Sequence, residues 1–144
     1  LYGIESDPHM FNLLEKVHTL KTRISQINEI NEGETVSYNR SGLVNKNSKI
    51  AVLSLGYADG LPRNISKNNY CVAIQKHKAS IIGVVCMDMT MVDVSHIEGV
   101  KVGDEVEIFG KSKPIETLAN VCQTIPYEIL CRISTRIKRL YTQG

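Results

Sequence analysis

The sequence predicts a mostly β protein, a closed or partly open β-barrel that carries one short helix. Two observations lead to this fold class. Short runs rich in β-branched residues recur along the chain, and residues typical of turns separate them at short intervals. Only residues 115–122 show clear helical spacing, with apolar side chains at positions i, i+3, i+4 and i+7. A chain of 144 residues can bury a core of its own.

Residues 13–30 carry an ambiguous pattern. Apolar residues recur there at helical spacing: Leu13, Val17, Leu20, Ile24 and Ile27. Leu20, Thr22 and Ile24 also alternate as in a strand, but the periodicity taken alone favours a helix. A turn is expected at residues 31–34, where Gly33 can adopt a positive φ.

From residue 35 onward the pattern favours strands. The expected strands are residues 35–38, 49–55, 70–75, 80–85, 89–95, 105–109, 128–134 and 137–141. Residues 49–55 form a nearly continuous apolar run and are expected to be a central strand. The segment 56–63, with two glycines and a proline, is expected to be a shaped loop, and residues 76–78 a hairpin turn. Pro114 is expected to begin the helix and Pro126 to end it.

The composition is that of a globular protein without a strong charge. Hydrophobic residues make up 42% and charged residues 22%, and the net charge of +2 is too small to favour a nucleic acid or a membrane surface. No apolar run is long enough to span a bilayer, and no signal peptide is recognisable. Because the chain begins with Leu1 rather than Met, we expect a piece of a longer protein.

The cysteine and histidine residues argue against metal and disulfide chemistry. Cys71, Cys86, Cys122 and Cys131 have no CxxC or Cys/His ligand spacing, and the histidines show no metal spacing. We therefore expect no metal site, reduced thiols and a cytoplasmic protein. Motifs for a nucleophile elbow, a phosphate loop, a zinc helix or a calcium loop are also missing from the sequence.

Residues 81–94 are the strongest candidate for a site. Two β-branched runs flank the tetrapeptide CMDM, and Asp88 would be costly in such apolar surroundings without a partner. A turn between two core strands is the alternative explanation, because aspartate commonly forms turns. Tyr38, Tyr57 and Tyr127 also lie in turn-like contexts, where a phenol could serve in acid–base chemistry or simply line the rim of the barrel.

A set of motifs resembles bacterial alanine racemase. They are VSYNRSG at residues 36–42, LGYADGLPR at 55–63, GVVCMDMTMVDV at 83–94, VKVGDEVEIFG at 100–110 and IPYEILCRIS at 125–134. The motifs occur in the order of the family, and the distance between GYADG and CMD is specific. The sequence LYGI at residues 1–4 is similar to the end of the domain that precedes this one in the family. The chain is therefore identified as a member of this family, and the part of the enzyme that it resembles is the C-terminal domain.

The resemblance implies one part of a two-domain enzyme. It assigns residues 1–12 to the end of a preceding α/β barrel and a linker, and residues 13–144 to a β-barrel domain that begins with a strand. The family interconverts L-alanine and D-alanine with pyridoxal phosphate, for cell-wall precursors. Most of the cofactor site, including its lysine, lies in the N-terminal barrel, so this chain alone is expected to be inactive. The family forms head-to-tail homodimers, in which each active site combines two subunits.

Five residues acquire substrate-related roles through the resemblance. Tyr38 matches the catalytic tyrosine that takes the α-proton of L-alanine, a step for which the base needs reach. Met87 matches the residue whose backbone N–H binds the substrate carboxylate. Tyr57, Asp88 and Arg63 match residues that line the approach of the substrate.

Two further positions bear on the cofactor and on selectivity. Tyr127 matches the tyrosine that contacts the cofactor phosphate within its own chain. Val84 departs from the family, which often has an arginine at this position. The approach of the substrate would then carry less charge, which leaves open a racemase for another amino acid such as serine or lysine.

A non-catalytic dimerisation or binding module is the rival hypothesis of another class. In that case Tyr38 would be structural, and a basic cluster near the C-terminal end would face an acidic partner. The cluster consists of Arg132, Arg136, Lys138 and Arg139. We interpret it instead as a solvated face. Replacing Tyr38 by phenylalanine distinguishes the hypotheses, because a structural tyrosine would leave the activity of the full enzyme nearly unchanged.

Overall fold

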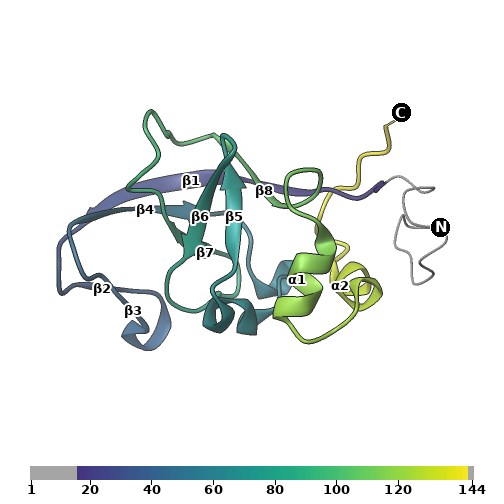
Figure 1. The fold of residues 1–144 in the computed structure, drawn as a ribbon, viewed down its shortest axis with the longest axis horizontal. Helices are drawn as coiled ribbons and strands as arrows, with labels where there is room; N and C mark the ends of the chain where they lie inside the picture. Colours follow the sequence, from purple (N-terminus) through teal and green to yellow (C-terminus); the bar gives the residue numbers. More distant parts are fainter. Residues whose placement is uncertain (1–15, 143–144) are drawn as a thin grey trace.

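The computed structural model describes residues 16–142, apart from the side chains of residues 67 and 68. Its centre is a closed barrel of six antiparallel strands (Figure 1), which confirms the predicted β-barrel. In barrel order the strands are β1 (Leu20–Ile30), β4 (Ser48–Leu53), β7 (Thr90–Asp93), β6 (His77–Ile81), β5 (Cys71–Ile74) and β8 (Glu105–Phe109). No helix in the described residues is long and apolar enough to cross a membrane.

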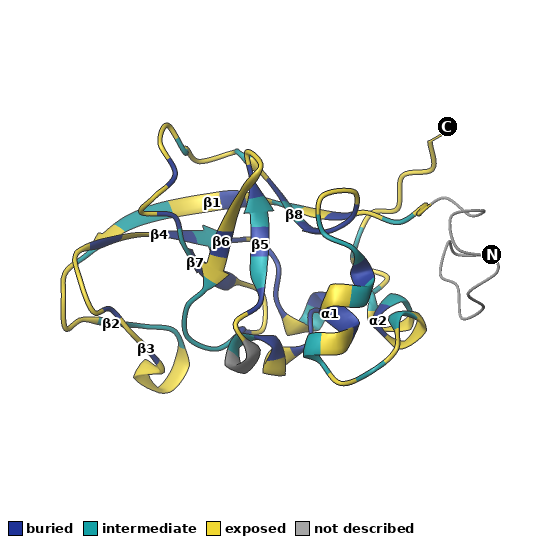
Figure 2. Ribbon diagram, viewed as in Figure 1, coloured by how far each residue is buried: buried dark blue, intermediate teal, exposed yellow. Residues whose placement is uncertain are grey.

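Shorter elements lie around the barrel. They are the two-stranded sheet of β2 (Thr35–Val36) and β3 (Gly42–Leu43), the 3₁₀ turns η2 (Tyr38–Arg40), η3 (Tyr57–Asp59) and η4 (Arg63–Asn68), and the helices α1 (Ile115–Val121) and α2 (Pro126–Arg132). The two helices contact each other at the opposite side of the molecule from β2 and β3 (Figure 1). Buried positions gather on the barrel strands and on one side of each helix, whereas the η2 turn is largely exposed (Figure 2).

Strand β1 closes the barrel because it is long enough to pair with two neighbours. Residues 20–23 pair with β8, and residues 24–30 pair with β4. A bulge interrupts the pairing with β4 between Ile24 and Gln26. Bulges bend a strand and increase its twist, so this one allows β1 to follow the curve of the barrel.

The periodicity favoured a helix for residues 13–30, and this prediction is wrong because β1 occupies most of the range. Residues 13–15 lie outside the described residues. The bulge explains the misleading period. Leu20 and Ile24 point into the core, and the extra residue at the bulge moves the next inward position to Ile27. Inward side chains thus recur at i, i+4 and i+7, which is also the spacing of a helix face.

Strand β4 is apolar on both faces because both faces are covered. Ala51 and Leu53 point into the barrel, whereas Ile50 packs outside it in a second cluster with Cys86 and Met91. Strand β2 and the segment after β6 contribute to this outer cluster. The nearly continuous apolar run that predicted a central strand therefore follows from burial on both sides.

The C-terminal part of the chain is more helical than predicted. The strand expected for residues 128–134 is wrong because α2 covers most of it, so the domain has two short helices rather than one. Pro126 begins α2, and α1 ends earlier, at Val121. Ile129 is fully buried and fixes the inward face of α2. Residues 137–141, also predicted as a strand, do not form one.

The hairpin between β5 and β6 also differs in detail. It turns at Gln75 and Lys76, with φ values of 49° and 71°, rather than at residues 76–78. Positive φ at both central residues is typical of a type I′ turn, whose twist matches that of paired strands. Strand β6 ends at Ile81, before the predicted end at residue 85, because the chain leaves the barrel there to form the outer cover of β4.

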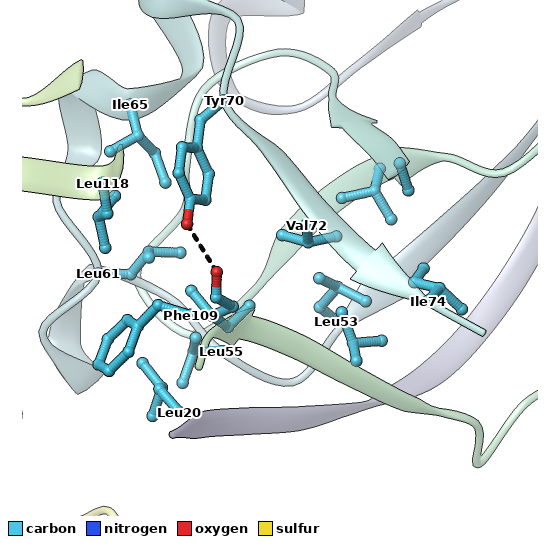
Figure 3. Packing of buried hydrophobic residues seen from close by; sticks show 14 of the residues in the cluster. Leu20, Leu53, Leu55, Leu61, Ile65, Tyr70, Val72, Ile74, Phe109 and Leu118 are labelled. Atoms are coloured by element: carbon cyan, nitrogen blue, oxygen red, sulfur yellow. Dashed lines mark hydrogen bonds between the residues drawn. The ribbon is translucent and has the colours of Figure 1, made fainter. Parts of the chain in front are cut away.

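Tyr70 anchors one end of the barrel core. It is buried in the same cluster as Leu61, Ile65 and Leu118 (Figure 3). Its hydroxyl donates a 2.6 Å hydrogen bond to the Ile108 carbonyl, shown as a dashed line in Figure 3. Burial raises the pKa of this phenol well above its ordinary value of 10.0, because the charged form would lose its water.

Replacing Tyr70 with phenylalanine should lower the free energy of unfolding by about 1–2 kcal/mol, because the Ile108 carbonyl loses its partner. The free energy of unfolding of the variant should also fall less as the pH is raised above 10.0. The unfolded chain ionises this phenol near pH 10.0 and the folded chain only at higher pH, so the stability of the neutral phenol is complete below pH 10.0 and falls above it. Urea unfolding of both chains between about pH 8 and about pH 11 measures the effect. Equal alkaline losses would contradict this role of Tyr70.

Candidate functional site

The register between β4 and β7 brings two loops together. Leu53 at the end of β4 pairs with Thr90 at the start of β7. The loop after β4 and the loop before β7 therefore leave the barrel at the same end. We call residues 56–60 the GYADG loop and residues 86–89 the CMDM tip. The Thr90 hydroxyl donates a 2.7 Å hydrogen bond to the Leu55 carbonyl, which fixes the start of the GYADG loop.

The GYADG loop and the CMDM tip are joined through their main chains. The N–H groups of Tyr57 and Ala58 donate to the carbonyls of Cys86 and Met87, each over 2.9 Å. Gly56 makes this approach possible, because a β-carbon there would lie 2.2 Å from the Met87 carbonyl oxygen. The φ of Gly56 is −141°, which any residue can adopt. Glycine is therefore required at this position for space alone.

The CMDM tip turns tightly and exposes its two central residues. The Cys86 N–H donates to the Met89 carbonyl over 2.9 Å, which leaves Met87 and Asp88 at the end of the tip. Met87 is 48% exposed. Among the residues that the structure describes, none accepts a hydrogen bond from the Met87 N–H. A free amide at such a position can donate to an anionic oxygen of a ligand.

Tyr38 stands on a turn that is tied to the segment before the CMDM tip. The Ser37 hydroxyl donates to the Val84 carbonyl over 2.7 Å and accepts from the Val84 N–H over 3.1 Å. Ser37, Asn39 and Arg40 have φ values of 72°, 54° and 52°. Residues other than glycine rarely adopt such values, and backbone strain of this kind is concentrated at functional sites. The strained turn holds Tyr38 with 51% of its surface exposed.

A cleft of about 540 Å³ lies beside these segments. It is lined by Tyr38, Tyr57, Gly60, Leu61, Pro62, Arg63 and Arg132. Two guanidinium groups and two phenols face a cleft whose described lining includes no carboxylate and no lysine. Such donors suit a carboxylate or a phosphate. In residues 16–142 no group of three or more His, Cys, Asp or Glu side chains could hold a metal ion.

Arg132 is held in the cleft lining by its own helix. Its Nη2 lies 2.5 Å from Glu128 Oε1, one turn earlier in α2. Glu128 also accepts a hydrogen bond from the Thr124 hydroxyl. The Thr124 hydroxyl and then the Arg132 guanidinium hold the pKa of Glu128 below its usual range. The carboxylate therefore stays charged and keeps Arg132 oriented.

The structure places the sequence-predicted site residues in three settings. Three of them line the cleft: Tyr38, Tyr57 and Arg63. Met87 and Asp88 lie on the CMDM tip, which is bonded to the GYADG loop but does not line the cleft. Tyr127 lies in the first turn of α2 with 43% of its surface exposed, also outside the lining.

Asp88 lies exposed on a turn between two strands, the alternative explanation that the sequence offered, and it nevertheless has a charged partner. Arg136 Nη2 lies 2.8 Å from Asp88 Oδ1, and Arg136 Nε lies 3.4 Å from Asp59 Oδ1. The four residues of the basic cluster are exposed, as the interpretation as a solvated face predicts, but Arg136 is also paired with the two aspartates and Arg132 lines the cleft. Sequence reasoning did not place Arg132, Arg136 or Asp59 in the site. The available signal was that Arg132 and Asp59 lie inside family motifs and that Arg136 follows one of them closely.

Comparison with known proteins decides the family. The sequence pattern of the family described as "Alanine racemase, C-terminal domain" matches residues 17–141. The chain belongs to the alanine racemase C-terminal domain family. Alanine racemase 2 of Caldanaerobacter subterraneus subsp. tengcongensis is 44% identical to it, over 98% of this chain and 38% of that protein. The chain thus spans less than two fifths of the length of this racemase.

Solved alanine racemases share the fold of this domain. The biosynthetic alanine racemase from Pseudomonas aeruginosa superposes with a TM-score of 0.89 at 30% identity, over 99% of this chain and 40% of that chain. The alanine racemase from Bartonella henselae with covalently bound pyridoxal phosphate also gives 0.89, at 35% identity, over 98% of this chain and 38% of that chain. The resemblance and the fold drawn from the sequence motifs are confirmed.

Replacing Gly56 with alanine should push the GYADG loop away from the CMDM tip and lower the free energy of unfolding by about 1–3 kcal/mol. Amide hydrogen exchange at Tyr57 and Ala58 measures the separation, since both N–H groups would lose their acceptors. Gly99→Ala is the control: its φ is 66° but its β-carbon would meet nothing, so it should add backbone strain and leave this exchange unchanged. Slow exchange in Gly56→Ala would contradict the steric argument.

Proposed function

We propose that the full-length protein carrying this domain interconverts L-alanine and D-alanine with pyridoxal phosphate, and so supplies D-alanine for cell-wall precursors. The observation that carries the proposal is Tyr38, which stands on a strained and exposed turn beside a cleft suited to an anion. The names of the most similar relatives, which are alanine racemases, support this reaction.

The full-length protein would have two domains. Residues 1–12 would be the end of an N-terminal α/β barrel and a linker, and residues 13–144 would be the C-terminal domain. This chain spans 38% of the racemase relative, and the remaining length leaves room for such a barrel. Without it the chain would be inactive. All four cysteines are free, which supports a cytoplasmic location for the enzyme.

A head-to-tail homodimer would bury apolar side chains that the site segments expose. Tyr38, Tyr57, Met87 and Met89 are 38% to 51% exposed. Grouped aromatic and methionine side chains on a surface are typical of contact regions. In the dimer, the cleft and the CMDM tip of one subunit would complete the active site on the N-terminal barrel of the other.

Pyridoxal phosphate, when bound, supplies the electron-withdrawing ring that makes the α-proton of an amino acid removable. The arginines and phenols of the cleft fit an anionic group. Because the described lining of the cleft includes no lysine, the amine that bonds to the cofactor aldehyde would come from the N-terminal barrel. We assign Tyr127 to contact with the cofactor phosphate within its own chain.

The residues of this chain would act on the substrate rather than on the cofactor. Tyr38 would be the base: its phenolate oxygen would take the α-proton of L-alanine and become the neutral hydroxyl, and its exposed turn gives it reach. The Met87 N–H, which is free within the described residues, would bind the substrate carboxylate. Tyr57, Asp88 and Arg63 would line the approach of the substrate.

A racemase for serine or lysine is the alternative within the same chemistry. Val84 keeps it open, because the family often has an arginine at this position and valine brings no charge to the approach of the substrate. The full-length enzyme should nevertheless show its highest kcat/KM with alanine in a panel of alanine, serine and lysine. A higher value with another amino acid would overturn alanine as the substrate.

Replacing Tyr38 with phenylalanine in the full-length protein should lower the rate of racemisation from L-alanine by about 10²–10⁴-fold, the usual contribution of a general base. Exchange of the α-hydrogen with solvent deuterium, started from L-alanine and from D-alanine, measures proton abstraction separately on each side. The loss of α-hydrogen exchange should be confined to reactions that start from L-alanine. The absorbance of the bound cofactor should be retained.

Tyr141→Phe serves as the matched control, because Tyr141 is 92% exposed and lines no part of the cleft. Its rates should equal those of the unaltered enzyme. Normal exchange from L-alanine in Tyr38→Phe would mean that Tyr38 is structural, in favour of a non-catalytic dimerisation or binding module.

A further inference from the structure

One arginine side chain bridges the acidic groups of both site loops. Arg136 follows α2, and its Nη2 lies 2.8 Å from Asp88 Oδ1 on the CMDM tip. Its Nε lies 3.4 Å from Asp59 Oδ1 in the GYADG loop. The hydrogen bond to Asp88 and then the charge of Asp59 raise the pKa of the guanidinium above its ordinary value. The arginine therefore stays charged while it joins the two loops.

Asp59 is the buried end of this bridge. Its side chain is 8% exposed, and its Oδ2 accepts a 2.9 Å hydrogen bond from the Gly56 N–H, which closes the GYADG loop on itself. The Ser134 N–H donates to the Asp59 carbonyl over 3.0 Å, so the segment that carries Arg136 is fastened to the same loop. A buried carboxylate needs such compensation, and Arg136 provides the positive charge.

Asp88 is the exposed end of the bridge and lies next to Met87, whose N–H is the proposed donor to the substrate carboxylate. Without Arg136, Asp88 would present an uncompensated negative charge beside an incoming carboxylate. Two like charges a few ångströms apart at a protein surface repel strongly enough to weaken binding by about tenfold or more. The guanidinium removes this repulsion by pairing with Asp88.

We propose that Arg136 is a positioning residue for substrate binding: it neutralises Asp88 and holds the CMDM tip against the GYADG loop, so that the Met87 N–H can receive an amino-acid carboxylate. The inference rests on the proposed function. Arg136 and Asp88 are both about half exposed, so their pair contributes little to stability, whereas the pairing of Arg136 with the buried Asp59 carboxylate contributes more. The loss of Arg136 should therefore lower both the substrate affinity and the melting temperature, and only the loss of affinity should depend on the charge of Asp88.

Arg136→Gln in the full-length enzyme should raise the KM for L-alanine by about tenfold, with kcat within about twofold of normal. The melting temperature should fall, because the buried Asp59 carboxylate loses its positive charge. Raising the ionic strength should reduce the difference in KM, because salt screens exposed charges. Lys138→Gln is the matched control: it removes one positive charge from the same segment, and Lys138 is not a partner of Asp59 or Asp88.

Adding Asp88→Asn to Arg136→Gln should restore KM to within about threefold of normal, because the repelling charge is removed with its partner. Arg136→Lys keeps one positive charge but lacks the two separate nitrogens that reach Asp59 and Asp88. Its KM should lie between those of the unaltered enzyme and Arg136→Gln. This variant carries the test if the glutamine variant does not fold.

Three outcomes would overturn the proposal. If the unaltered enzyme is active and Arg136→Gln has the same KM, the proposed role of Arg136 is refuted and the proposed function still stands. A rise in KM that Asp88→Asn does not reverse would make Arg136 a structural residue that acts through Asp59. If the unaltered full-length protein does not racemise alanine, the proposed function fails, and the role of Arg136 fails with it.

Discussion

The antiparallel register of β4 and β7 is the constraint on which the site depends. It sets Leu53 opposite Thr90, and the GYADG loop and the CMDM tip then meet because they continue these two strands. Strand β1 closes the barrel on the other side of β4 and helps to fix that register. A shift by one residue would exchange the inner and outer side chains of β4, whose two faces are both buried. The position of the site is thus a property of the barrel as a whole.

The sequence predicted the elements whose periodicity is undisturbed. Helix α1 and the central strand β4 have regular spacing and were recognisable from it. Strand β1 was not, because its bulge turns an alternating pattern into one that matches a helix face. The short apolar run of α2 fits a strand as well as a helix, so its pattern does not distinguish them. Pro126 begins this helix, although a proline at that position also predicts the end of the preceding one.

The candidate site was predictable in kind but not in its connections. The family motifs indicated Tyr38, Tyr57 and Arg63, which line one cleft. The partner expected for Asp88 is present, but the apolar setting on which that expectation rested is not, because Asp88 is exposed. No local rule could name Arg136, which lies 48 residues away from Asp88 in the chain. The positive φ values of Ser37 and Arg40 were equally invisible, because neither residue type favours this region as glycine or asparagine does.

The closed barrel also limits how this domain can associate with anything else. In the described structure each of its six strands is paired with two neighbours, although residues 20–23 of β1 pair with β8 alone and residues 24–30 with β4 alone. An incoming chain therefore finds no whole strand at an open edge to extend. Recognition of a partner therefore depends on loops and side chains, which can change from one relative to another while the barrel beneath them stays the same.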